Sequence, residues 1–171
     1  MESATKICVV GPPGVGKTAI ARLLADWDTS AGAPYVATQA LRIQELDRSL
    51  GKKRFSIQLW DCSGDSEFQP CWPALQRGAH GLILVRNAEA SLEEQEKQLE
   101  NWYKVFATPN RLKASQCVIV NVSRSNGGVS GLPAGSGRGL LANVNQVNVS
   151  LLEPDCQQRL FLALEGILGG A

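Results

Sequence analysis

The feature that most constrains this chain is the run Gly-Pro-Pro-Gly-Val-Gly-Lys-Thr at residues 11–18. It matches a phosphate-binding pattern, a glycine and four residues followed by Gly-Lys-Ser/Thr. The apolar run at 5–10 predicts a strand before it, and apolar residues three and four apart predict a helix over 17–27. This order aims backbone N–H groups at an anion. The expected phosphate-side residues are Gly11, Pro13, Gly14, Val15, Gly16, Lys17, Thr18 and Ala19.

Strand and helix signals alternate along the 171 residues, which predicts an α/β fold with a mostly parallel sheet and helices on both faces. The short connection at 48–52 predicts one antiparallel pair at the sheet edge. We expect a single domain over 1–171, with a polar loop at 28–37 and a flexible Gly/Ser-rich loop at about 123–139. The six expected strands are 5–10, 39–47, 53–60, 81–86, 117–122 and 144–149.

Two further helices are expected. Ser91 and Glu94 form a capping-box pattern at the start of a long helix, whose apolar stripe includes Leu99, Trp102 and Phe106. Pro154 at its start and Gly169-Gly170 past its end bracket a last helix. Its expected buried face is Leu160, Phe161, Leu164 and Ile167.

Composition argues against several classes of protein. The net charge is +1 without a basic excess, so nucleic acid is not an expected partner. No apolar run reaches 18 residues, and the ends carry no lipidation motif, so we expect no lipid anchor and a cytoplasmic protein. The five cysteines lack metal-ligand spacing, and His80, the single histidine, is expected to be structural.

A second motif follows the expected strand at 53–60. Asp61 stands where phosphate-loop proteins place a carboxylate near Mg²⁺, and Thr18 would offer its hydroxyl to the same ion. Lys17 would reach the β- and γ-phosphates. The N–H of Gly64, at Asp-x-x-Gly spacing, would donate to a γ-phosphate only while that phosphate is present, which predicts a switch. The alternative for 11–18 is a glycine-rich turn that only joins two elements.

This arrangement resembles the Ras/Rab superfamily of small GTPases. The resemblance implies a P-loop NTPase of the Ras-like G-domain type that binds GTP or GDP with Mg²⁺. Thr38 matches the threonine that ligates Mg²⁺ in that family, although it also suits an ordinary β-edge position. The glycine-rich loop alone is also similar to that of AAA-type ATPases, but Asp61 is followed by Cys62 instead of their glutamate.

The chain departs from the superfamily at two places. Asp65 stands where a glutamine usually orients the attacking water, so we expect weak hydrolysis. The base-reading Asn-Lys-x-Asp motif is replaced by the run from Asn121 to Arg124, which lacks both the lysine and the guanine-selecting aspartate. Asn121 and Ser123 remain candidate nucleotide contacts, and the choice between GTP and ATP stays open.

A narrower resemblance is carried by Trp60-Asp61-Cys62, the run at 71–75 and Thr38-Gln39. These are similar to the Rab-like subunits of the intraflagellar transport B particle. That resemblance implies a hetero-oligomer with the coiled-coil subunits 74 and 81, and a location in the cytoplasm, the cilium or flagellum and the basal body. Trp72 either anchors a partner helix or packs beneath the second helix.

Three functions fit these observations. The first is a binding module gated by nucleotide, whose segments 34–40 and 62–75 face a partner. The second is a hydrolase that turns over, against which Asp65 argues. The third is a structural subunit stabilised by its nucleotide.

Overall fold

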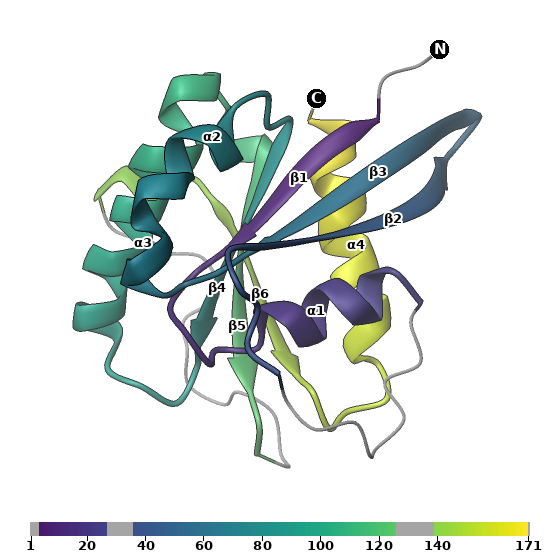
Figure 1. The fold of residues 1–171 in the computed structure, drawn as a ribbon. Helices are drawn as coiled ribbons and strands as arrows, with labels where there is room; N and C mark the ends of the chain where they lie inside the picture. Colours follow the sequence, from purple (N-terminus) through teal and green to yellow (C-terminus); the bar gives the residue numbers. More distant parts are fainter. Residues whose placement is uncertain (1–3, 27–35, 126–138, 171) are drawn as a thin grey trace.

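The computed structural model describes residues 4–26, 36–125 and 139–170. A six-stranded sheet in the order β2-β3-β1-β4-β5-β6 runs through the molecule (Figure 1). Only the β2–β3 pair is antiparallel, and it forms one edge. The expected sheet is therefore confirmed. The strands are β1 Thr5–Val10, β2 Leu41–Leu50, β3 Lys53–Cys62, β4 Gly81–Asn87, β5 Cys117–Ser123 and β6 Asn145–Ser150.

The burial of each strand follows from its place in the sheet. β1, β4 and β5 are almost continuously buried, because helices cover both of their faces and every side chain meets apolar neighbours. From its third residue on, β2 alternates between exposed and buried or partly buried positions because it lies at the edge. Gly51 makes the tight turn between β2 and β3 with a φ of 60°, and the basic residues beside it are exposed, as expected for a solvated hairpin end.

Helices pack on both faces of the sheet, and each face has its own core (Figure 1). α1 (Lys17–Leu24) and α4 (Cys156–Gly169) cover one face. α2 (Trp72–Gln76) and α3 (Leu92–Phe106) cover the other. Short 3-10 helices at Ser66–Cys71, Thr108–Asn110, Ala114–Gln116 and Gly139–Leu141 complete the described elements.

The apolar stripes of the two long helices are largely as predicted. Leu99, Trp102 and Phe106 of α3 are buried, as are Leu160, Leu164 and Ile167 of α4. Phe161 is only half-buried. Its ring packs at the margin of the apolar core, and the guanidinium of Arg48 lies 3.4 Å from the ring centroid.

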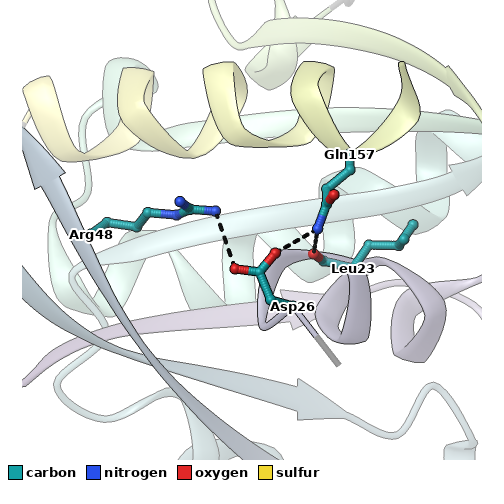
Figure 2. Close-up of polar contacts among 4 residues, drawn as sticks. All are labelled: Leu23, Asp26, Arg48 and Gln157. Carbon is teal, nitrogen blue, oxygen red and sulfur yellow. Dashed lines mark hydrogen bonds and ion pairs between the residues drawn. The ribbon is translucent and has the colours of Figure 1, made fainter. Parts of the chain in front are cut away.

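α1 is shorter than the predicted helix over 17–27, and polar contacts fix its end (Figure 2). Asp26 adopts a left-handed φ of 53°, which stops the helix. Gln157 of α4 donates through Nε2 to the carbonyl of Leu23 at 2.8 Å and to Asp26 Oδ1 at 2.7 Å. Arg48 Nη2 lies 3.9 Å from Asp26 Oδ2. These contacts join α1, β2 and α4.

Two predicted helix starts were wrong in detail. Ser91 precedes α3, but its side chain makes no capping hydrogen bond. The Gln95 amide occupies this region instead, accepting from Asn87 N and donating to the carbonyls of Asn87 and Ser91. α4 begins at Cys156, two residues after Pro154, because Pro154 and Asp155 lie in a turn.

Parts of four predictions lie outside the described residues. These are Trp27, most of the loop at 28–37, residues 34–35 of the partner-facing segment predicted at 34–40, and residues 126–138 of the predicted loop at 123–139. Ser123 itself is the last residue of β5. None of the described helices is both long enough and apolar enough to cross a bilayer.

Candidate nucleotide-binding site

The phosphate loop turns from β1 into α1 as its sequence predicts. Gly14 and Gly16 have left-handed φ angles of 72° and 104°, which residues with a side chain rarely adopt. A Cβ on Gly11 would collide with the backbone carbonyl of Val85 in β4, so this glycine allows the loop to leave the sheet. The loop therefore packs tightly against the strand ends, with α1 starting at Lys17.

Lys17 is buried beneath the loop. Its Nζ donates to the carbonyl of Pro12 at 2.7 Å, and its side chain is only slightly exposed. Burial lowers the pKa of Lys17 to about 8, and the nearby Asp61 carboxylate opposes that shift. A buried ammonium group with one carbonyl partner retains donors for an anion.

Three oxygen atoms from distant segments meet beside Lys17. Thr18 Oγ1 donates to Asp61 Oδ2 at 2.7 Å, and Thr38 Oγ1 donates to the same oxygen at 2.9 Å. The two hydroxyl oxygens are 3.0 Å apart. Asp61 is fully buried, and its other oxygen, Oδ1, has no hydrogen-bond partner. The structure thus brings together all three predicted metal ligands.

This oxygen cluster fits a magnesium ion. Mg²⁺ prefers hard oxygen ligands and commonly binds through one carboxylate together with substrate phosphates. The described residues hold no group of three or more His, Cys, Asp or Glu side chains able to bind a metal by themselves. The unpartnered Asp61 Oδ1 and the two hydroxyls therefore suit an ion that arrives with a polyphosphate.

The segment after β3 lies directly against the phosphate loop. A Cβ on Gly64 would collide with the carbonyl oxygen of Gly11 and come within 2.7 Å of backbone atoms of Pro12 and Pro13. The next residue, Asp65, accepts from the N–H of Glu67 at 3.0 Å and so begins the following 3-10 helix. The Asp65 carboxylate is therefore engaged as the N-cap of that helix.

A cavity of about 210 Å³ opens over these groups. It also includes side chains that the motifs did not predict. Arg124 could have been suspected from its position after β5, where the Asn-Lys-x-Asp motif of the superfamily ends. Its charge, however, is opposite to that of the aspartate of that motif. Nothing in the sequence indicated Leu151. The cavity is lined by Pro13, Gly14, Gly16, Lys17, Thr18, Ala19, Arg22, Ala37, Thr38, Ser63, Gly64, Asp65, Arg124 and Leu151.

Asn121 and Ser123 are not among the lining residues. The Asn121 side chain accepts from Arg86 Nε and donates to Asn148 Oδ1 at 2.6 Å, within a row of buried and partly buried side chains across β4, β5 and β6. Ser123 Oγ donates to Glu89 Oε1 at 2.8 Å. Val15 packs in the apolar core beneath the loop. These three residues therefore support the site from outside the cavity.

Burial and hydrogen bonding show the roles of two other residues singled out in the sequence, Trp72 and His80. Trp72 is 6% exposed, and its ring centroid lies 3.9 Å from that of Trp102. Trp72 is the first residue of α2, and its side chain packs inward against α3, which contradicts the partner-anchor interpretation. His80 accepts from the backbone N–H of Lys6 at 3.1 Å, a structural contact between β1 and the start of β4.

Comparison with known proteins agrees with this geometry. The family model for Roc, the Ras of Complex domain of DAPkinase, matches residues 6–124. Strand order, phosphate loop and this match define a P-loop protein of the Ras-like G-domain class. Intraflagellar transport protein 22 of Chlamydomonas reinhardtii is 41% identical over 133 residues, which cover 76% of this chain and 68% of that protein. The chain belongs to the intraflagellar transport protein 22 family.

Other relatives extend the comparison. The human and zebrafish homologues are each 38% identical over 120 residues, which cover 67% of this chain and 63% of each relative. The chain thus matches slightly less than two thirds of the length of these vertebrate proteins. Among solved structures, the GTP-bound crystal structure of T. brucei IFT22/74/81 has a TM-score of 0.69 and 27% identity. That match covers 98% of this chain and 96% of the other.

Proposed function

We propose that this protein binds a guanine nucleotide with Mg²⁺ and serves as a GTPase-like subunit of the intraflagellar transport B particle. The observation that carries the proposal is the meeting of Thr18, Thr38 and Asp61 beside Lys17, each from a different segment. Burying a carboxylate with an unpartnered oxygen costs free energy, and a bound cation would offset that cost. The GTP-bound relative supports the choice of guanine nucleotide.

Each group would then have a defined role. Lys17 would donate to phosphate oxygens, and Thr18, Thr38 and Asp61 would hold Mg²⁺. The bound ion supplies neutralisation of the phosphate charge. Gly64 brings its backbone to the phosphate loop because no side chain keeps the two apart. Hydrolysis is expected to be weak, since the Asp65 carboxylate caps a helix and would repel the γ-phosphate.

The same cluster links nucleotide to a surface. Thr38 lies just before β2, and the N–H of Ser63 donates to the carbonyl of Ala40 at 2.9 Å, which ties the segments on either side of the β2–β3 pair together. On the β2–β3 face, Ile43 is 44% exposed and pairs with the half-buried Trp60. We propose that this face contacts the coiled-coil subunits 74 and 81, consistent with the composition of the T. brucei complex.

The test compares partner affinity in two nucleotide states. Purified protein loaded with a non-hydrolysable GTP analogue should bind the 74–81 pair more tightly than protein loaded with GDP, because only the γ-phosphate state fixes both segments. Equal affinities would contradict the gating and favour a purely structural role for the nucleotide. A single-turnover GTPase rate as high as that of an activated small GTPase would contradict weak hydrolysis.

A matched pair of variants tests the surface. Ile43→Asp places a charge on the β2–β3 face and should weaken partner binding. Leu162→Asp is the control, because Leu162 is a similarly apolar, 63% exposed residue on α4, a helix of the opposite face. Equal effects of the two variants would show that the contact lies elsewhere.

Release of the bound nucleotide by denaturation, followed by its identification, tests base identity directly.

A further inference from the structure

Arg124 lies at the edge of the cavity in a position that the family motif assigns to no cation. It follows directly after β5, and its Nη2 donates to the carbonyl oxygen of Gly14 in the phosphate loop at 2.8 Å. The two residues are 110 positions apart in the chain. The guanidinium has five N–H donors, and this bond uses one of them. The side chain is exposed and lines the cavity, so its remaining donors and its planar faces are accessible.

The backbone around Arg124 is fixed by hydrogen bonds to the side chain of Glu89. Glu89 Oε1 accepts from the N–H groups of Arg124 and Ser125, each at 3.2 Å, and from the Ser123 hydroxyl. These donors, the Ser123 hydroxyl above all, lower the pKa of Glu89. The carboxylate therefore stays ionised at neutral pH and organises the turn that carries Arg124.

Leu151 forms the neighbouring wall. Its N–H donates to the carbonyl of Ser123 at 3.1 Å, which fixes it beside the same turn. Its Cδ1 lies 3.7 Å from the place a Cβ on Gly16 would occupy, so it also packs against the phosphate loop. One apolar side chain and one flat cation thus border the cavity together, which is a surface suited to the two faces of an aromatic ring.

We propose that Arg124 binds the base of the nucleotide by stacking its guanidinium plane on the purine ring. This inference rests on the proposed nucleotide function and adds the residue that holds the base. Stacking by a guanidinium depends on the ring and not on its substituents, so Arg124 supplies affinity for purines in general. It cannot accept a hydrogen bond from the base, because a guanidinium has only donors.

A purely structural role for Arg124 makes a different prediction. If its bond to Gly14 only stiffened the phosphate loop, its loss would weaken binding of any polyphosphate. If it binds the base, its loss would weaken only ligands that contain one. Calorimetry with GDP, ADP and inorganic tripolyphosphate separates the two roles. Arg54→Ala, at the hairpin end far along β3, removes the same charge from an exposed pair with Asp47 and is the matched control.

Arg124→Ala should bind GDP and ADP about tenfold more weakly than the unchanged protein does. Its affinity for tripolyphosphate should stay within about twofold, as should all affinities of Arg54→Ala. Arg124→Lys keeps the charge but lacks the plane, so it should fall between the two for GDP. Thermal melting without ligand confirms that each variant is folded.

Two results would overturn the inference while leaving the proposed function intact. One is an unchanged GDP affinity in Arg124→Ala. The other is an equal loss for GDP and tripolyphosphate. Failure of the unchanged protein to bind any of the three ligands would instead refute the proposed function itself, and the role of Arg124 with it.

Discussion

The two sides of the cavity are built in contrasting ways. On the phosphate side, defined by Lys17, Thr18, Thr38, Asp61 and Gly64, each residue type matches the superfamily pattern, and the groups meet within hydrogen-bond distance or backbone contact. On the base side, defined by Arg124 and Leu151, an arginine stands in place of the expected acid. Under the proposed function, polyphosphate binding and base recognition are therefore separable tasks in this fold.

The physical reason lies in what each task requires. Polyphosphate binding uses backbone N–H groups, a cation and hard oxygen ligands, and the positions of the cation and the oxygen ligands accept few residue types. Base selection rests on one or two side chains that can change without disturbing the core. Asn121 illustrates this freedom, because its side chain hydrogen-bonds to Arg86 and to the partly buried Asn148 outside the cavity.

The largest expected effect falls on the phosphate side. Lys17→Ala removes a buried ammonium group from contact with the phosphates, and GDP affinity should drop at least about a hundredfold, on the order of 3 kcal/mol. Isothermal calorimetry with GDP and Mg²⁺ measures it. An affinity close to that of the unchanged protein would show that the phosphates bind elsewhere. The assignment of a phosphate side to this cavity would then be wrong.

The pH dependence of binding is the next largest effect. Burial places the pKa of Lys17 at about 8 in the ligand-free protein, and an anionic ligand must raise it. The affinity for GDP should therefore be full below pH 8 and fall by up to about tenfold per unit as pH rises above 8, toward the raised pKa of the complex.

Calorimetry at pH 7, 8 and 9 tests this dependence. Lys17→Arg is the control, since arginine stays charged throughout that range and its residual affinity should not change with pH. A flat profile in the unchanged protein would mean that Lys17 is already fully charged without ligand or does not touch the phosphates.

Much of the phosphate side was predictable because each of its motifs is a short local run of sequence. The run at 11–18 and the aspartate at the end of β3 can each be recognised from the sequence around them. The contact of Arg124 with Gly14 was not predictable, since it depends on how two loops from distant parts of the chain approach each other. The packing of Trp72 was equally hidden, because an apolar residue does not reveal whether its neighbour lies within the chain or on a partner.

A smaller effect is expected from Gly64→Ala. The added methyl would meet the backbone of the phosphate loop, with Pro12 and Pro13 atoms at 2.7 Å, so the segment after β3 must move away. Binding of a GTP analogue should weaken by about tenfold, and GDP binding should change less because it lacks the γ-phosphate.

Gly166→Ala in α4 is the matched control for Gly64→Ala. A Cβ there meets nothing within 4 Å, so nucleotide affinity should not change. Equal losses for GTP analogue and GDP in Gly64→Ala would indicate general damage to the phosphate loop and not loss of a γ-phosphate contact.

The smallest expected effect concerns the base side and is the difference in affinity between GDP and IDP, which should be close to zero. IDP differs from GDP in lacking the exocyclic amine. In GDP this amine donates a hydrogen bond that an acidic residue would normally accept. Among the described lining residues the only carboxylate is Asp65, beside the phosphate loop and Gly64, and Arg124 offers donors alone. GDP and IDP should therefore bind within about threefold of each other. Arg124→Asp restores an acceptor and should favour GDP, whereas strong discrimination by the unchanged protein would mean that another group reads the amine.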